Sequence, residues 1–251
     1  MTANAAILGP TMHPNITKRQ QHILGTLVRE YVASAEPVAS GDLVQKYRLP
    51  YSPATVRSEL VALDGAGYLT QPHTSAGRIP TDRGYRFFIN HVLESREPAV
   101  ENRDERAFEA LAEVESPAEF LKQASRLVAH LTQNAVLAGF PNEDLFYKSG
   151  MSEVAQAPEF IEAPTMREFA ALLDVLDDEM EGLWKTLDAR EPLVFIGREN
   201  PIASARHYGM IVSALETPFH REGVIALLGP KRMDYARNVA IMRRLSEALA
   251  D

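Results

Sequence analysis

The chain of 251 residues contains no cysteine. This absence excludes disulfides, thiolate zinc sites, iron–sulfur clusters and cysteine nucleophiles together, and it suits a reducing compartment. The sequence also lacks any apolar run near the roughly 18 residues that a membrane-spanning helix needs. The first 15 residues show no basic segment followed by an apolar core, so we expect a disordered tail there and no secretory signal. A cytoplasmic protein without a membrane partner is therefore expected.

Motifs for catalysis and cofactor binding are equally scarce. The sequence has neither a Gly-x-Gly-x-x-Gly fingerprint nor a Walker-type phosphate loop. Its seven histidines include no pair at the spacing of metal ligands on a helix. The acidic run from Asp174 to Glu181 accompanies an apolar stripe, which indicates a solvated helix face and not a metal site. The sequence thus predicts no enzyme, no metal and no cofactor.

What is present is a globular composition with uneven charge. Hydrophobic residues make up 45% of the chain, enough to bury a core. The formal net charge of −8 counts, taken alone, against a nucleic-acid partner. Residues 1–95 nevertheless hold nine basic and seven acidic side chains, a charge of +2, so the rest of the chain carries −10. The N-terminal part is therefore the candidate for contact with nucleic acid.

The N-terminal part predicts three helices, then a strand, a polar loop and a fourth helix. Two short helices joined by a four-residue turn, followed by a strand and a basic loop, are typical of a winged helix-turn-helix. The signals are, in chain order, the capping box of Thr17 and Gln20, the N-caps Ser40 and Ser52, the strand 68–72, the loop 73–80 and the N-cap Thr81.

The third helix carries the most informative residues. It turns Val56, Leu60 and Leu63 toward the core, which leaves the opposite face and the N-terminal end for the major groove of DNA. Arginine can bridge O6 and N7 of guanine, and hydroxyls contact bases or phosphates. Alternatively, the arginine is a surface residue paired with a nearby acid. We favour DNA contact because of the surrounding element order, and the expected contacts are Ser52, Ala54, Thr55, Arg57 and Ser58.

The polar loop predicts a wing. Its small hydroxyls and single arginine can lie along phosphates or place Arg78 in a minor groove. The alternative is a plain hairpin turn with Gly77 at positive φ, and both interpretations can hold because the glycine would shape the loop that presents the arginine. The expected backbone and wing contacts are His73, Thr74, Ser75, Arg78 and Arg86.

Beyond the winged helix the sequence predicts a charged helical stretch and then mixed strands and helices, hence an α+β class. Ser116 and Glu119 form one expected capping box, and Thr165 with Glu168 opens a long amphipathic helix with another. Strands are expected at 135–140, 145–148, 193–197, 208–215 and 223–229, with a last helix at 235–249. The expected organisation is a tail 1–15, a winged helix domain 16–95, a helical connector 96–133 and an α+β domain 134–251.

Several of these segments together resemble the HrcA family of heat-inducible transcription repressors. The wing is the most specific of them, because residues 71–81 read QPHTSAGRIPT and are followed by Gly84, Tyr85 and Arg86. The other matching segments are 36–40, 52–60, 67–69, 195–201 and 223–237.

The resemblance implies a homodimeric repressor that binds double-stranded DNA at a palindromic operator, the CIRCE element, ahead of chaperone operons. It also implies the fold: a winged helix and a GAF-like domain, with a dimerising domain inserted into the latter. The chaperonin GroEL is the further partner that the resemblance implies, since its diversion to unfolded proteins under heat relieves repression.

Two departures from the family pattern are visible. Ser58 stands where members commonly carry asparagine, which affects the expected operator preference. Residues 134–140 resemble the first GAF-like strand, yet the chain passes almost at once to 149–160, which resembles a much later segment. The resemblance thus implies a shortened GAF-like domain, with dimer contacts supplied by residues 98–133 or by the helix 165–188.

A second function class remains open from the sequence. GAF-like domains often hold small molecules, so the chain could be a protein-interaction or ligand-sensing regulator with altered operator specificity. An apolar cavity edged by groups such as Arg198, Asn200 and Lys231 would favour that class. A core filled by side chains would count against it.

Overall fold

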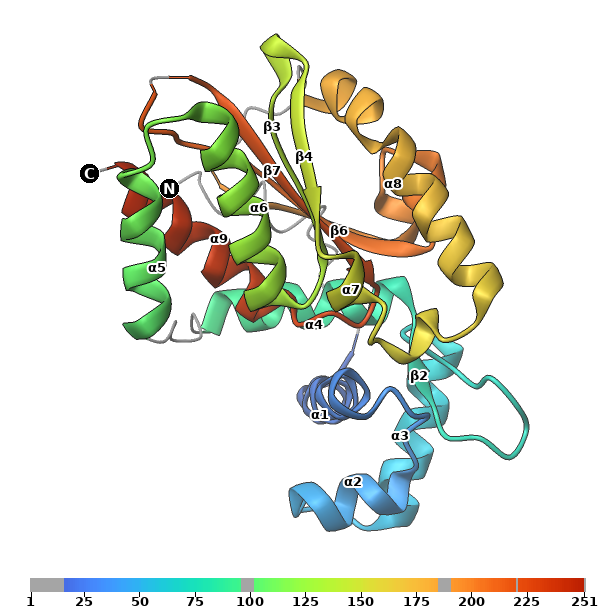
Figure 1. Cartoon of the computed structure of the whole chain (residues 1–251). Coiled ribbons are helices and arrows are strands. Elements are labelled where there is room, and N and C mark those ends of the chain that lie inside the picture. The colour runs from blue at the N-terminus through green and yellow to red at the C-terminus, as the bar shows by residue number, and fades with distance from the viewer. Residues whose placement is uncertain (1–15, 96–101, 185–190, 220, 251) are drawn as a thin grey trace. The chain divides into compact units, whose positions relative to one another are not determined.

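The computed structural model describes residues 16–95, 102–184, 191–219 and 221–250 (Figure 1). The chain divides into two compact units, one within residues 8–95 and the other within residues 96–251. Each unit has its own buried hydrophobic core. The tail predicted at residues 1–15 lies outside the described residues.

The N-terminal unit has the helix and strand order that the sequence predicts. Its first helix starts where the capping box predicts: Thr17 Oγ1 accepts the Gln20 N–H at 3.2 Å, and Gln20 Oε1 accepts the Thr17 N–H at 2.9 Å. The elements are α1 (Lys18–Ser34), α2 (Ser40–Tyr47), α3 (Pro53–Gly65), β1 (Leu69–Thr70), β2 (Ile79–Pro80) and α4 (Asp82–Ser95).

The start of α2 differs from the prediction by one residue. Ser40 is already helical, and Ala39 occupies the N-cap position without a side-chain hydrogen bond. The reason lies just upstream, where Val38 pairs in extended conformation with Arg78. The chain is therefore held extended up to that bridge and enters the helix directly after it, so the serine cannot act as the cap.

The strand predicted at residues 68–72 is shorter than expected. Only Leu69 and Thr70 pair, antiparallel, with Pro80 and Ile79. The next residue, Gln71, leaves the ladder and turns its side-chain amide onto carbonyls of the loop. A two-residue ladder therefore closes the wing at its base.

The C-terminal unit is built on one antiparallel sheet of five strands in the order β4-β3-β7-β6-β5. Its helices and strands are α5 (Asn102–Ala112), α6 (Pro117–Thr132), β3 (Ala135–Phe140), β4 (Leu145–Ser149), α7 (Met151–Val154), α8 (Ala163–Trp184), β5 (Leu193–Ile196), β6 (Tyr208–Leu215), β7 (Gly223–Pro230) and α9 (Tyr235–Ala250). Short 3-10 turns lie at Pro141–Glu143, Pro158–Phe160, Gly197–Glu199 and Ala203–Ala205.

Helices cover both faces of this sheet (Figure 1). Leu137, Ala226 and Val212 lie opposite one another across the three central strands and belong to the core that α8 covers. One residue along, Val136 and Leu227 are paired and point to the other face, where α5, α6 and α9 pack (Figure 1). Strands with two buried faces explain why β6 and β7 read as nearly continuous apolar runs.

The long helix α8 begins earlier than its predicted cap. Its first residue is Ala163, and the Glu162 carbonyl accepts the Met166 N–H at 3.1 Å. The prediction that Thr165 caps the helix was therefore wrong. Pro164 sits in the first turn, where a missing N–H leaves no hydrogen bond unmade, so the helix can start before the threonine.

The start of α6 is confirmed, but its capping box is not formed. Ser116 Oγ accepts the Glu119 N–H at 3.5 Å. The Glu119 carboxylate accepts hydrogen bonds from Lys122 and Gln123, both at 3.1 Å, so it faces the next turn and does not reach back to the cap.

The predicted α+β class is confirmed. The five predicted strands of the C-terminal unit are present within one or two residues of their expected bounds, and they form the sheet that the shortened GAF-like domain was expected to contain. None of the helices in the described ranges combines the length and the apolarity that crossing a bilayer requires.

Candidate nucleic-acid interface

The candidate interface starts at the N-terminus of α3. Ser52 is the N-cap: its Oγ accepts the Thr55 N–H at 3.1 Å, and the two side-chain oxygens lie 2.9 Å apart. Pro53 follows as the first helical residue, where its fixed φ suits the helix. Both features were predicted. Ser52 accepts the Thr55 and Val56 N–H groups and Pro53 has none, so the Ala54 N–H is the group at this helix end that no described residue accepts, and it can meet an anion such as phosphate.

The two faces of α3 differ sharply. Val56, Leu60 and Leu63 are buried, as predicted. The opposite face exposes Ala54, Arg57 and Ser58, and also Val61 and Ala62, which were not singled out from the sequence. The structure thus brings the predicted α3 contacts together on one accessible surface.

Both acidic residues of α3 are engaged away from this surface. Glu59 is buried and accepts hydrogen bonds from Arg19 Nε at 2.6 Å and Gln20 Nε2 at 3.0 Å. Asp64 pairs with Arg78, with 2.8 Å between Oδ2 and Nε. Neither carboxylate is left to repel a phosphate backbone from the exposed face of the helix.

Arg57 is exposed and makes no hydrogen bond or ion pair with any residue that the structure describes. The alternative interpretation, a surface arginine paired with a nearby acid, therefore finds no partner within the described ranges. An unpaired guanidinium on an acid-free helix face can make bidentate bonds to guanine or to phosphate.

Arg48 is a second available cation that sequence reasoning missed. It follows α2 as the C-cap in the left-handed region, with φ 49°, and is the first residue of the turn to α3. Its side chain is exposed and unpaired among the described residues. The available signal was a basic residue inside the turn of a helix-turn-helix, a place close to the DNA backbone in such motifs.

The neighbouring Lys46 is committed elsewhere. Its Nζ donates to Glu30 Oε1 at 2.8 Å, and Tyr47 donates to Glu30 Oε2 at 2.9 Å, which ties α2 to α1. The hydrogen bond from Lys46 lowers the pKa of the Glu30 carboxyl below its ordinary value. Of the two basic residues at the end of α2, only Arg48 is thus free to bind an external anion.

The wing is a loop held by its own polar groups. Gln71 Nε2 donates to the carbonyls of Thr74 at 3.0 Å and Ala76 at 2.8 Å, and the Ala76 N–H donates to the His73 carbonyl at 2.9 Å. His73, Thr74 and Ser75 are exposed at the tip, which projects from the helices of its unit (Figure 1). The structure therefore brings the three predicted tip residues together.

At its base the wing is fixed to the loop before α2. Val38 and Arg78 exchange two backbone hydrogen bonds, of 3.0 and 2.9 Å. Gly77 lies so close to this bridge that a Cβ atom there would overlap the carbonyl group of Val38. Its φ is not positive, so the hairpin interpretation was wrong on this point: close backbone contact, and not a left-handed conformation, requires the glycine.

Two of the predicted contacts are not presented with the others. The Arg78 side chain is only 15% exposed and lies against Asp64 as an ion pair, although its Nε–H does not point along a hydrogen-bond direction. Arg86 in α4 is only 9% exposed. Both side chains are turned into the unit, because the wing base and α4 pack against the other helices.

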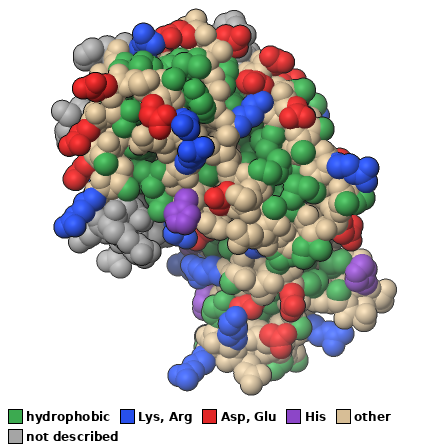
Figure 2. All heavy atoms as spheres, in the orientation of Figure 1, with side chains coloured by type: hydrophobic (Ala, Val, Ile, Leu, Met, Phe, Trp, Pro, Cys, Tyr) green, Lys and Arg blue, Asp and Glu red, His purple; other side chains and the backbone are tan. Residues whose placement is uncertain are grey.

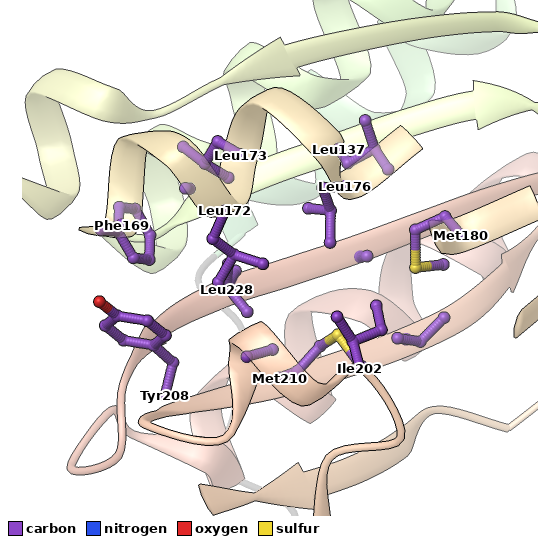
Figure 3. Packing of buried hydrophobic residues seen from close by; sticks show 14 of the residues in the cluster. Leu137, Phe169, Leu172, Leu173, Leu176, Met180, Ile202, Tyr208, Met210 and Leu228 are labelled. Atoms are coloured by element: carbon purple, nitrogen blue, oxygen red, sulfur yellow. The ribbon is translucent and has the colours of Figure 1, made fainter. Parts of the chain in front are cut away.

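The C-terminal unit offers little to the ligand-sensing alternative. The space between α8 and the sheet is filled by apolar side chains, among them Phe169, Leu176 and Met210 (Figure 3). Asn200 is buried, and its amide donates to the Ala205 carbonyl at 3.1 Å, so it stabilises a turn. Within the described ranges, no three His, Asp or Glu side chains gather as a metal site would need.

Comparison with known proteins adds three findings. The family model "HrcA protein C terminal domain" matches residues 86–239. The chain is 42% identical over 126 residues to the heat-inducible transcription repressor HrcA of Desulforudis audaxviator, covering 50% of this chain and 37% of that protein. It is 44% identical over 138 residues to the HrcA of Chloroflexus aggregans, where it covers 36% of the relative. The chain thus spans little more than a third of these two relatives.

A longer alignment explains this short coverage. The HrcA of Anaeromyxobacter sp. strain K is 27% identical over 345 positions, which cover 94% of this chain and 97% of that protein. Because this chain has only 251 residues, the relative contains internal residues without a counterpart here. A crystal structure described only as a hypothetical protein has the same fold, with a TM-score of 0.75 and 20% identity, covering 93% of this chain and 98% of that one.

Proposed function

Because residues 86–239 match the HrcA model, this chain belongs to the HrcA family, and we propose that it is a transcriptional repressor that binds an inverted-repeat operator as a homodimer. The observation that carries the proposal is the exposed face of α3, which is free of acidic groups and presents Arg57 without a partner among the described residues. The names of the relatives, heat-inducible transcription repressors, support the same function.

In this proposal α3 enters the major groove and Arg57 reads a base, assisted by Ser58. Ser52 and Thr55, at the N-terminus of the helix, meet a phosphate. The wing tip, with His73, Thr74 and Ser75, lies along the flanking backbone. Arg78 and Arg86, which are turned inward, support these contacts from behind and do not make them.

Repression follows from occupancy. Two copies of α3 in successive major grooves, about 34 Å apart, would cover a palindrome and exclude the transcription machinery. Following the family resemblance, we assign the CIRCE-like operator and the chaperone operons as targets, and cytoplasmic DNA as the place of action. We assign the dimer contacts to residues 98–133 or to the segment 165–188, most of which lies in α8, since the internal stretch of the longer relative is missing here.

A gel shift with the full chain tests this function. The probes are a CIRCE-like palindrome, one half-site and a scrambled duplex, with the molar mass measured in the same buffer. We expect a dimer that prefers the palindrome strongly over the half-site. A monomer indifferent to the second half-site would overturn the dimer, and equal affinity for the scrambled duplex would overturn the repressor.

The chaperonin partner is tested separately. The full chain is refolded from denaturant with and without GroEL and ATP, and the fraction competent to bind the palindrome is titrated. We expect GroEL to raise this fraction and an added unfolded protein to lower it again. An active fraction that does not respond to either addition would remove GroEL from the proposal.

A further inference from the structure

Val61 stands in the middle of the candidate DNA-reading face. Its side chain belongs to the few large apolar groups that remain exposed, with 55% of the residue accessible. It follows Ala54, Arg57 and Ser58 at spacings of seven, four and three residues, so all four lie on one side of α3. The buried residues of the helix occupy the opposite side.

A valine is a poor choice for an exposed helix position on stability grounds alone. Its branched Cβ restricts χ1 and lowers helix propensity relative to alanine, and its apolar surface stays in water. A single exposed apolar residue is common on protein surfaces and by itself indicates nothing. Here its position matters, because the helix face around it holds no acid and presents Arg57, for which the described ranges contain no partner.

The major groove offers one apolar group, the 5-methyl of thymine. Homeodomain recognition helices read that groove with residues at the spacing i, i+3, i+4 and i+7, which is the spacing of Ala54, Arg57, Ser58 and Val61. Resting on the repressor function proposed above, we propose that Val61 is a specificity-determining residue that packs against a thymine methyl in each half-site.

The helix geometry also limits where this thymine lies. Arg57 and Val61 are separated by four residues, or about 6 Å of helix axis at a rise of about 1.5 Å per residue. One base-pair step spans about 3.4 Å. The thymine that Val61 contacts therefore lies within about two base pairs of the base that Arg57 reads.

Deoxyuridine tests the inference, because it removes only the methyl group. The experiment uses the full chain and the palindromic duplex that it binds, which is selected from random DNA if the CIRCE-like sequence is not bound. Each thymine of this duplex is replaced in turn by deoxyuridine, symmetrically in both half-sites. For wild type we expect one position at which affinity falls, by about fourfold per half-site and about fifteenfold for both, as for loss of one buried methyl-sized group. Val61→Ala should bind the thymine and uracil duplexes equally.

The control is Ile161→Ala, which removes an exposed apolar side chain from the other unit, outside both segments proposed for dimer contacts. It should keep the full difference between thymine and uracil. If wild type shows no such position, or if Val61→Ala keeps the difference, the inference is overturned while the repressor stands. If Val61→Ala lowers the affinity for both duplexes by the same factor relative to wild type, the ratio between thymine and uracil is unchanged. The role of Val61 is then structural and the inference is again overturned. If no duplex is preferred by wild type, the proposed function fails and the inference fails with it.

Discussion

The exposed face of α3 and the base of the wing show how differently two arginines from one predicted site are used. Arg57 on α3 is exposed and has no partner within the described residues. Arg78 at the wing base is 15% exposed in its side chain and lies against Asp64. Charge and sequence position suggested DNA contact for both side chains. Whether an arginine is free to contact DNA also depends on whether an acidic side chain lies next to it. The exposed face of α3 is therefore accessible to a partner, whereas the Arg78–Asp64 pair links the wing base to α3.

The largest expected effect is a loss of stability from a substitution that disrupts the wing base. Gly77→Ala places a Cβ against the Val38 carbonyl, between two backbones that are hydrogen-bonded to each other and cannot both move away. Overpacking of this kind costs roughly 1–3 kcal/mol, and we expect the upper end, about 3 kcal/mol of unfolding free energy. Chemical denaturation followed by circular dichroism measures it.

Gly65→Ala is the control for that substitution. Gly65 ends α3, and a Cβ there would meet no atom within 4 Å. Alanine is the better helix former, so stability should stay level or rise by up to about 1 kcal/mol. Equal losses at the two glycines would show that close contact at Val38 does not distinguish them.

The next largest effect is expected for DNA affinity, from a substitution on the exposed face of α3. Arg57→Ala should weaken binding to the palindrome by about 1–3 kcal/mol and relax the preference at one base pair per half-site. Stability should not change, since the side chain makes no contact with charged or polar groups in the described structure. The measurement is a set of titrations against single-base variants of the operator. Arg237→Ala, at an exposed position of α9 outside the segments proposed for dimer contacts, is the control and should leave every titration unchanged. If Arg57→Ala gives the same titrations as this control, Arg57 does not contact a base.

A smaller effect sharpens the contrast between the arginines. If Arg78 acts through Asp64, then Arg78→Ala and Asp64→Ala should weaken DNA binding alike, and the double variant should be no worse than either. We expect a coupling of about 1 kcal/mol for this partly buried pair. The slope of affinity against salt should stay at its wild-type value in all three variants, whereas a phosphate contact by Arg78 would flatten it in every variant that lacks the arginine.

Local signals explain why much of the fold could be predicted. Thr17 with Gln20 and Ser52 with Pro53 fix helix starts through contacts within three residues, which a sequence displays directly. The apolar stripe of α3 and the runs of β6 and β7 likewise follow from periodicity. These features also predict which face of α3 is exposed, because burying one side of the helix determines which side remains accessible.

The failures concern contacts between residues distant in the chain. Asp64 meets Arg78 and Val38 meets Arg78 only after the wing folds back, so neither pairing is visible in local sequence. The misplaced cap at Thr165 has another cause, since several residues near a helix start can satisfy the same pattern and Pro164 decides among them. The exposure of the predicted site residues was therefore predicted best on the outer face of α3 and least well at the wing base, where Arg78 is turned inward.

The two units differ in net charge, and the smallest effect that we expect follows from this difference. The visible face of the C-terminal unit shows scattered acidic side chains with basic ones between them (Figure 2), as expected for a unit of −10. Under the proposed function, attraction of the +2 N-terminal unit to DNA depends on a few cations that have no partner among the described residues, and Arg48 is one of them. Arg48→Ala should weaken binding to all duplexes evenly, by about three- to fivefold at low salt, and reduce the salt slope by about 1.

Lys46→Ala is the matched control for Arg48→Ala, because it removes a cation two residues away that is already bound to Glu30. It should leave the salt slope unchanged, since a lysine neutralised within the protein releases no counterion from DNA. It should instead lower stability slightly, by freeing the Glu30 carboxylate. Equal slopes for the two variants would mean that pairing within the unit does not decide which cations reach DNA, and the contrast between Arg57 and Arg78 would lose its explanation as well.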